Sequence, residues 1–162
     1  EPVLWPAYSR VLDYELELGI FIGRTGRDIR REDARAHIFG YTVYNDVSAR
    51  DAQADEMAGM LGPAKGKDFA TTLGPYLVPV ADLGERRQPG PRGDHFALRM
   101  RARHNGEQVA QGNLADMSWT FAEIIARASY GVTLHPGEVI EEKISLSERA
   151  SPGSSLMIGP EG

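Results

Sequence analysis

The sequence predicts an α+β protein that is mainly β, with antiparallel and mixed strands and two or three helices packed outside them. Residues 12–22 alternate apolar and polar side chains with a period of two, which is typical of a strand with one face in the core. Asn105-Gly106 lies between two extended runs and favours a type I′ hairpin turn. Residues 121–128 instead space apolar side chains at i, i+3, i+4 and i+7, which predicts an amphipathic helix.

The composition is that of an ordinary globular protein. The chain has 162 residues, of which 41% are hydrophobic and 25% charged, and we expect a single domain over residues 1–162. No apolar run approaches the roughly 20 residues of a membrane helix, and there is no signal-peptide pattern. The absence of cysteine excludes disulfides and thiolate metal sites, which suits a cytoplasmic protein. Because the net charge is −5, we do not expect nucleic acid as a partner, and because no long apolar run is present we do not expect a membrane.

The strand over residues 12–22 carries acidic side chains on its polar face. Its even positions are apolar, whereas its odd positions begin with Asp13, Glu15 and Glu17. Glu15 and Glu17 share that face with Cα atoms about 7 Å apart, so both carboxylates can reach one cation at oxygen distances of roughly 2.1 to 2.5 Å.

A second strand ends at Asp46, on which the predicted site depends. Residues 41–44 are β-branched or aromatic and favour an extended strand, whereas Asn45-Asp46 favours leaving it. A carboxylate at a strand end is well placed to bind a ligand. With Glu15 and Glu17, Asp46 forms a candidate oxygen-only site for Mg²⁺, Mn²⁺ or Ca²⁺. The residues alone leave a solvated acidic strand face equally open.

A helical turn over residues 48–53 follows this strand. It projects Arg50 and Gln53 along one side through their i, i+3 spacing, and both side chains can face the cleft beyond Asp46. The alternative is that Arg50 pairs with a local carboxylate such as Asp51 or Asp55.

The second helix begins near Thr120, whose hydroxyl can form a capping box with Glu123. Its apolar stripe contains Phe121, Ile124 and Ile125, which we expect in the core together with Leu16. The other expected elements are, in order, a turn at 23–28, a helix over 31–39 capped by Gly40, a loop over the site at 54–67, a strand at 76–80, a polar surface loop at 82–94, and a strand at 96–103 with a basic outer face.

Four ordered stretches of the sequence resemble the fumarylacetoacetate hydrolase family. They are DYELELGIFIG, FGYTVYNDVSARDAQ, KGKDFATTLGPYLVP and DMSWTFAEIIARASYGVTLHPGEVI, and together they cover most of residues 2–140. The resemblance is to the catalytic C-terminal domain, and it implies a rolled β fold of mixed sheets and a homodimer. Trp5, Trp119 or the arginine-rich strand would then be available for the contact between subunits.

The resemblance also implies roles for individual residues. Glu15, Glu17 and Asp46 match the divalent-metal ligands, and Arg50, Gln53 and Thr71 match positions that hold the carboxylate or carbonyl groups of the substrate. Lys67 matches a lysine that stabilises a developing enolate or oxyanion.

The implied reaction is hydrolysis of a carbon–carbon bond in an acylpyruvate-like or fumarylacetoacetate-like 1,3-dicarbonyl oxo acid, through a metal-stabilised enolate. Decarboxylation, isomerisation or hydration of a 2-oxo acid stays open as an alternative, as does a non-catalytic homologue. We name no general base, because family members often recruit one from an N-terminal or lid segment that is not found here. We also expect that the family's N-terminal segment is absent and that residues 141–162 form an atypical tail.

Overall fold

The computed structural model describes residues 2–144 and 146–149. Its largest sheet has five strands in the order β13-β2-β4-β6, with β7 also paired to β4. These strands are β2 (Glu17–Ile22), β4 (Ile38–Asp46), β6 (Thr71–Leu73), β7 (Val78–Pro79) and β13 (Val139–Lys143). All four ladders between them are antiparallel.

The other strands form smaller antiparallel sheets. One contains β10 (Arg99–His104), β11 (Glu107–Asn113) and β14 (Leu146–Arg149), and three others pair β1 (Leu12–Asp13) with β5 (Ser48–Ala49), β3 (Gly26–Arg27) with β12 (Thr133–Leu134), and β8 (Arg87–Gly90) with β9 (Gly93–Phe96). The helices are α1 (Arg50–Ala58) and α2 (Phe121–Ala128), with the 3₁₀ segments η1 (Arg31–His37), η2 (Val80–Arg86) and η3 (Leu114–Asp116). The expected α+β class, mainly β, is confirmed, although the ladders that the structure describes are antiparallel throughout rather than mixed.

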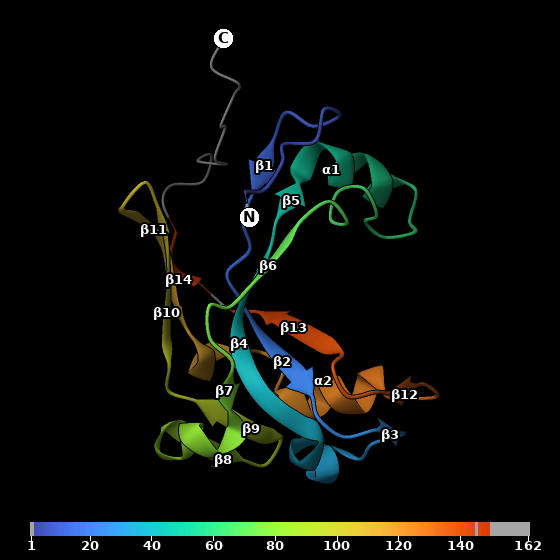
Figure 1. Ribbon diagram of the computed structural model, residues 1–162, viewed down its shortest axis with the longest axis vertical. Coiled ribbons are helices and arrows are strands. Elements are labelled where there is room, and N and C mark those ends of the chain that lie inside the picture. The colour runs from blue at the N-terminus through green and yellow to red at the C-terminus, as the bar shows by residue number, and fades with distance from the viewer. Residues whose placement is uncertain (1, 145, 150–162) are drawn as a thin grey trace.

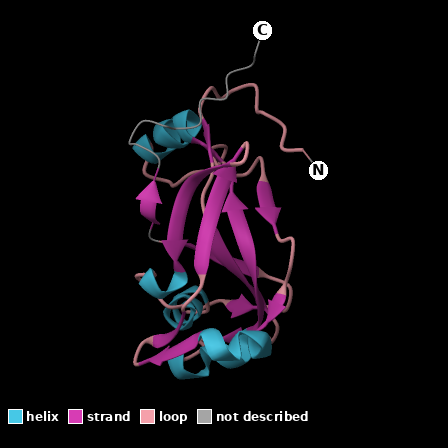
Figure 2. Ribbon diagram, turned by 90° about the vertical axis from the view of Figure 1, so that its left-hand side faces the viewer, coloured by secondary structure: helices cyan, strands magenta, loops and turns pink. Residues whose placement is uncertain are grey.

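The long strand β4 connects two ends of the molecule. At one end it leads into β5 and α1, whereas η1, β8 and β9 lie at the other end (Figure 1). Helices therefore lie at both ends of the strand layer, as the view turned by 90° shows (Figure 2). No helix in the described ranges is long and apolar enough to cross a membrane.

The core lies between β2 and α2. Leu18, Ile20 and Ile22 are buried on one face of β2, and Phe121 and Ile125 are buried on α2. Tyr41 of β4 completes the contact through edge-to-face packing on Phe96 and Phe121, with ring centroids 5.0 and 5.9 Å apart. The other face of β2 and β4 is thereby left for polar residues.

The strand predicted over residues 12–22 is interrupted. Residues 14–16 lie outside both β1 and β2, because the chain passes there from its pairing with β5 to its pairing with β4. In this gap the Glu15 N–H donates to the side-chain oxygen of Asn45 at 3.0 Å instead of to a neighbouring strand.

Three further expectations need correction. The short helix expected over 31–39 is present as the 3₁₀ helix η1, but it ends at His37. Gly40 is not its cap but part of β4, where a Cβ would lie 2.6 Å from the Val78 carbonyl oxygen. The loop expected at 54–67 begins inside α1. The loop expected at 82–94 contains most of η2 and the β8–β9 hairpin.

Two local predictions are confirmed. Asn105 and Gly106 have φ values of 49° and 88°, as a type I′ turn requires. Thr120 caps α2 by accepting a hydrogen bond from the Glu123 N–H, and the Glu123 carboxylate accepts one from the Thr120 N–H.

We expect Ile125→Ala to lower the free energy of unfolding by about 2 to 5 kcal/mol, because Ile125 is 0% exposed and its removal leaves a cavity. Ile124, which the sequence also predicted in the core, is only partly buried beside it, so Ile124→Ala should cost less. Urea denaturation of both variants measures the difference. Equal losses of unfolding free energy in the two variants would show that Ile124 and Ile125 of α2 are buried to the same extent.

Candidate active site

Strand register gathers polar residues on the face of the sheet that is turned away from α2. In the ladders Glu17 lies opposite Tyr44 on one side and Lys143 on the other, and Asp46 lies opposite Thr71. Side chains that face each other across a ladder point to the same face, as do those two residues apart on one strand. These five residues therefore share one face across four strands.

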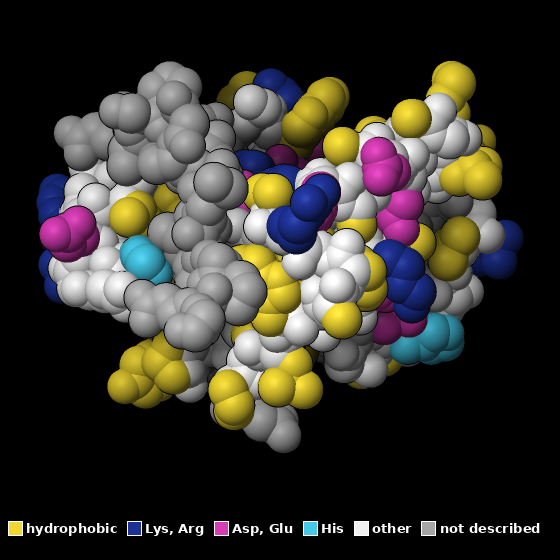
Figure 3. Space-filling model, turned by 90° about the horizontal axis from the view of Figure 1, so that it is seen from above, with side chains coloured by type: hydrophobic (Ala, Val, Ile, Leu, Met, Phe, Trp, Pro, Cys, Tyr) yellow, Lys and Arg dark blue, Asp and Glu magenta, His cyan; other side chains and the backbone are white. Residues whose placement is uncertain are grey.

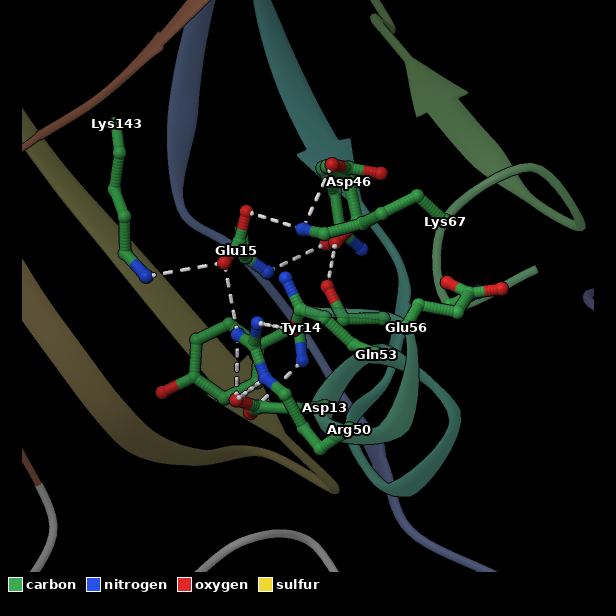
Figure 4. Close-up of polar contacts among 12 residues, drawn as sticks. Asp13, Tyr14, Glu15, Asp46, Arg50, Gln53, Glu56, Lys67 and Lys143 are labelled. Carbon is green, nitrogen blue, oxygen red and sulfur yellow. Dashed lines mark hydrogen bonds and ion pairs between the residues drawn. The ribbon is translucent and has the colours of Figure 1, made fainter. Parts of the chain in front are cut away.

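Lys67 lies at the centre of the cluster, between two predicted metal ligands. Its Nζ is 2.7 Å from Glu15 Oε2 and 2.8 Å from Asp46 Oδ2 (Figure 4). The three side chains are only 11–18% exposed. Burial alone would lower the pKa of Lys67, but the hydrogen bonds to Asp46 and Glu15 outweigh it and raise the pKa above its ordinary value. Lys67 is therefore a charged hydrogen-bond donor rather than a base.

Arg50 connects Glu15 to the first turn of α1. Its Nη2 donates to Glu15 Oε1 at 2.9 Å, its Nε to Asp13 Oδ2 at 2.8 Å, and its Nη1 to Gln53 Oε1 at 2.8 Å. The alternative of local pairing with Asp51 or Asp55 is not what the structure shows. Arg50 and Gln53 thus lie together at the cluster, as their spacing predicted.

Lys143 is a third cation at Glu15. It reaches Glu15 Oε1 from β13 with its Nζ at 3.2 Å, and its side chain is 45% exposed (Figure 4). Burial raises the pKa of Glu15, but hydrogen bonds from Lys67 and Arg50 and the charge of Lys143 hold that pKa well below its usual range. Glu15 is consequently an anion that three cations surround.

Glu17 has the opposite environment. It is 2% exposed, and its Oε2 is buried without a hydrogen-bond partner. Burial, followed by the neighbouring carboxylates of Glu15 and Glu141, raises the pKa of Glu17 to about 9. At neutral pH this carboxyl group stays protonated unless a further cation comes to it.

The loop before Lys67 is held against α1. The Glu56 carboxylate accepts hydrogen bonds from the N–H groups of Ala64, Lys65 and Gly66 at 2.7, 2.6 and 3.0 Å. Gly66 lies so close to the helix that a Cβ there would be 2.7 Å from Gln53 Cβ and 2.8 Å from its Cα. These contacts fix the backbone from which Lys67 reaches the two carboxylates.

We expect Gly66→Ala to destabilise the protein by about 1 to 3 kcal/mol, because the added methyl group overlaps the backbone of α1 and pushes the loop outwards. The displacement also moves Lys67, so turnover should fall with stability. Gly84→Ala is the matched control, since no atom lies within 4 Å of its added Cβ. Chemical denaturation of the two variants compares them, and equal stabilities would contradict the close contact.

The three predicted metal ligands, Glu15, Glu17 and Asp46, are not arranged around one position that a cation could occupy. Within residues 2–144 and 146–149, no three His, Asp or Glu side chains are arranged to hold an ion. The chemistry of the donors nevertheless fits a hard divalent cation, because all are carboxylate oxygens and Glu17 has an unpartnered one. The net charge of the cluster also favours a bound cation. In the described cluster five carboxylates (Asp13, Glu15, Glu17, Asp46 and Glu141) face three cations (Arg50, Lys67 and Lys143), which leaves two negative charges when all are ionised.

The sequence did not assign roles to Asp13, Glu56, Glu141 and Lys143. The sequence pattern could have indicated a role for Asp13, since it shares the odd-numbered polar face with Glu15. It gives no such indication for Lys143, because Lys143 lies just beyond Ile140, where the family resemblance ends. Thr71 is exposed at the edge of the cluster, opposite Asp46.

The model of the C-terminal domain of fumarylacetoacetate (FAA) hydrolase matches residues 1–141. The chain belongs to the fumarylacetoacetate hydrolase family. One family relative, oxaloacetate tautomerase YisK of Bacillus subtilis, is 37% identical over 129 residues, which are 80% of this chain and 39% of that protein. Another, the mitochondrial oxaloacetate tautomerase FAHD2A of Homo sapiens, is 36% identical over 140 residues, which are 86% of this chain and 42% of that protein. The chain thus spans about two fifths of the length of these relatives.

A solved structure of the family shows the same fold. The fumarylpyruvate hydrolase from Pseudomonas aeruginosa, in complex with Mn²⁺ and pyruvate, matches with a TM-score of 0.68 and 27% identity, over 87% of this chain and 60% of that chain. Since FAHD2A is mitochondrial, family membership does not fix the compartment, and the cytoplasmic location stays a prediction.

Proposed function

We propose that this member of the fumarylacetoacetate hydrolase family acts on 2-oxo acids by stabilising their enolate form, and that its reaction is keto–enol tautomerisation. The observation that carries the proposal is the position of the Lys67 ammonium between Glu15 and Asp46, with Arg50 and Gln53 beside it. These groups are preorganised by the sheet and by α1. A fixed positive charge is what an enolate oxygen requires as its negative charge develops.

The other residues of the cluster have complementary roles. The Arg50 guanidinium donates to Asp13 and Glu15, which fixes its charge beside the cluster, and its hydrogen bond to Gln53 Oε1 orients the Gln53 amide so that its NH₂ is available as a donor. We assign Arg50 and Gln53 to the substrate's carboxylate and carbonyl groups. Thr71 lies at the edge of the cluster and would contact the same substrate.

Glu15, Glu17 and Asp46 would hold Mg²⁺, Mn²⁺ or Ca²⁺ in this proposal. A divalent cation there would supply positive charge to the oxygen atoms of the oxo acid and favour its enolate. The neighbour with Mn²⁺ and pyruvate supports this assignment. Lys67, which contacts two of these carboxylates, would stay beside them as a donor to the substrate.

Tautomerisation is favoured over carbon–carbon bond hydrolysis by two observations. The relatives YisK and FAHD2A are oxaloacetate tautomerases. In addition, the described groups bonded to Lys67 and Arg50 are carboxylates and one amide, without a histidine to activate water. Hydrolysis of an acylpyruvate-like substrate is the second candidate, which the fumarylpyruvate hydrolase neighbour supports.

A paired assay tests the proposal. Decay of the enol absorbance of oxaloacetate measures tautomerisation, and loss of the acetylpyruvate absorbance measures hydrolysis, each with Mg²⁺, with Mn²⁺ and with a chelator. We expect metal-dependent acceleration of the first reaction by residues 1–162 or by a longer form of the chain. If neither form accelerates either reaction with any metal, the protein is a non-catalytic homologue.

We also propose that the protein is a homodimer. Met60 and Leu61, in the loop after α1, are 90% and 95% exposed, and Met57 and Trp119 are more than half exposed. Hydrophobic side chains project from the end of the molecule that carries α1 (Figure 3). Exposed apolar groups of this size are typical of an interface. Light scattering coupled to gel filtration measures the mass, and a monomer at high protein concentration would contradict this proposal.

A further inference from the structure

A cavity lies far from Lys67, at the opposite end of β4. It has a volume of about 280 Å³ and is lined by η1, the β8–β9 hairpin and the start of α2. These elements lie together at the end of the molecule opposite α1 (Figure 1). Nothing in the tautomerase proposal uses this cavity.

Three arginines line the cavity, and most of their donors are unused. The Arg31 side chain makes no hydrogen bond or ion pair with any residue that the structure describes. Arg35 has only a distant partner, Asp94, with Nε 3.9 Å from Oδ2. Arg87 is ion-paired with the same Asp94 oxygen, its Nε lying 2.6 Å from Oδ2, and its two terminal nitrogens have no partner among the described residues. A guanidinium carries five N–H donors, so the three arginines together have many donors left that can bind an anion.

Tyr41 provides a second, independent observation. The residue is 4% exposed, its ring is fixed against Phe96 and Phe121, and it lines the cavity without a hydrogen bond from its hydroxyl to any described residue. Burial, and then the charge of Asp94, raise the pKa of Tyr41 well above its usual range, although Arg35 and Arg87 oppose the shift. Tyr41 lines the same cavity as Arg35, Arg87 and Asp94. The hydroxyl oxygen itself is not among the fully buried polar atoms of the described residues, so it opens to the cavity and can donate its proton to a ligand there.

The carboxylates of the cavity satisfy only part of this donor capacity. Asp94 is shared by Arg35 and Arg87, and Glu32 lies 3.5 Å from Arg30, which does not line the cavity. The arginines therefore exceed the acidic groups in a chain whose net charge is −5. Because Ile38, Phe121 and Ala122 form an apolar wall, the ligand can also carry a small hydrocarbon part.

We propose that this cavity is a binding site for a small organic anion whose charged groups are phosphate or carboxylate oxygens, with Arg31, Arg35, Arg87 and Tyr41 as its donors. Both kinds of group accept several hydrogen bonds in one plane from a guanidinium. The cavity is near the lower end of the size of small-molecule sites, which suits a phosphate monoester or a dicarboxylate and excludes a nucleotide. The site is independent of the reaction at Lys67.

Titration of the folded protein with inorganic phosphate, phenyl phosphate and succinate tests the site. Calorimetry measures affinity at an ionic strength of about 0.1 M, and amide chemical shifts map the contact. We expect at least one probe to bind, with shifts confined to residues 31–41, 87–96 and 121–122. Absence of binding by all three probes overturns the proposal, as does binding that maps to the surroundings of Lys67.

Matched arginine variants separate this site from general charge attraction. Arg31→Gln with Arg35→Gln removes two exposed donors of the cavity, whereas Arg30→Gln removes a neighbouring exposed charge that pairs with Asp33 at 2.7 Å outside it. We expect the double variant to weaken binding by about tenfold or more and Arg30→Gln to leave it nearly unchanged. Equal weakening by both shows attraction by net charge only and overturns the proposal.

Tyr41→Phe removes only the hydroxyl and keeps the ring packing. We expect affinity to fall by about three- to tenfold, as for the loss of one hydrogen bond, with no loss of thermal stability. Unchanged affinity would remove Tyr41 from the set of donors and, with it, the observation that distinguishes the cavity from an ordinary basic surface.

Discussion

Lys67→Ala should lower the turnover of an accepted 2-oxo acid by about a hundredfold or more, the scale seen when one preorganised charge-stabilising donor is removed. The physical reason is that the Lys67 ammonium is the one described cation that contacts both Glu15 and Asp46. In the proposed reaction, its removal takes positive charge from the enolate oxygen as the negative charge develops there. Because the loss is specific to the transition state, it should appear in kcat more than in KM.

Lys67→Arg should not restore the activity. The ammonium occupies a space between two carboxylate oxygens 2.7 and 2.8 Å from it, and the planar guanidinium is too large for that position. Lys65→Ala is the matched control, because Lys65 is two residues away, 67% exposed and paired only with Asp68. Full activity of Lys67→Ala on a verified substrate, with Lys65→Ala as the reference, would show that the lysine has a structural role alone.

Short-range patterns could place the acidic residues of the site. Alternation predicts Glu15 and Glu17 on one polar face, and their side chains do interact, although Glu15 lies in the gap between β1 and β2. The β-branched run before Asn45 correctly ends β4 at Asp46. The capping box and the Asn-Gly turn were also predictable, since each depends on residues within a few positions of one another.

The partners of these residues could not be predicted in the same way. Arg50 pairs with Asp13, 37 positions earlier, rather than with the nearby Asp51 or Asp55. Lys143 reaches Glu15 across 128 positions, because β13 adds to the edge of β2. Such contacts depend on which strands pair and in what register, and neither is contained in the local pattern.

Gly40 illustrates the same limit. After a helical segment, a glycine is a reasonable C-cap, and the local sequence offers no reason to interpret it otherwise. Its actual constraint is the approach of β7, whose Val78 carbonyl oxygen would lie 2.6 Å from a Cβ. The arginine cavity is likewise invisible in the sequence, because Arg35 and Arg87 meet only after the β8–β9 hairpin packs beside η1.

Glu17→Gln should weaken the binding of Mn²⁺ on the order of a hundredfold, because it replaces an anionic ligand by a neutral amide of the same size. Glu142→Gln is the matched control. Glu142 lies on β13 opposite Leu18, so its side chain points to the other face of the sheet. Calorimetry or the Mn²⁺ paramagnetic resonance signal measures the affinity. Equal binding by Glu17→Gln and the wild-type protein would remove Glu17 from the predicted ligands.

The metal-free protein offers a test of Glu17 that does not depend on activity. Folding raises the pKa of Glu17 from an ordinary value of 4.5 to about 9, so folding takes up a proton between these pH values. The contribution of Glu17 to the free energy of unfolding should therefore be greatest below about pH 4.5 and should fall as the pH rises towards 9. Glu17→Gln cannot ionise and should lose that decline, which denaturation at about pH 5, 7 and 9 measures. A divalent cation that neutralises Glu17 should flatten the wild-type curve in the same way. Parallel curves for variant and wild type without metal would mean that the carboxylate ionises freely, and the physical reason for a cation beside it would disappear.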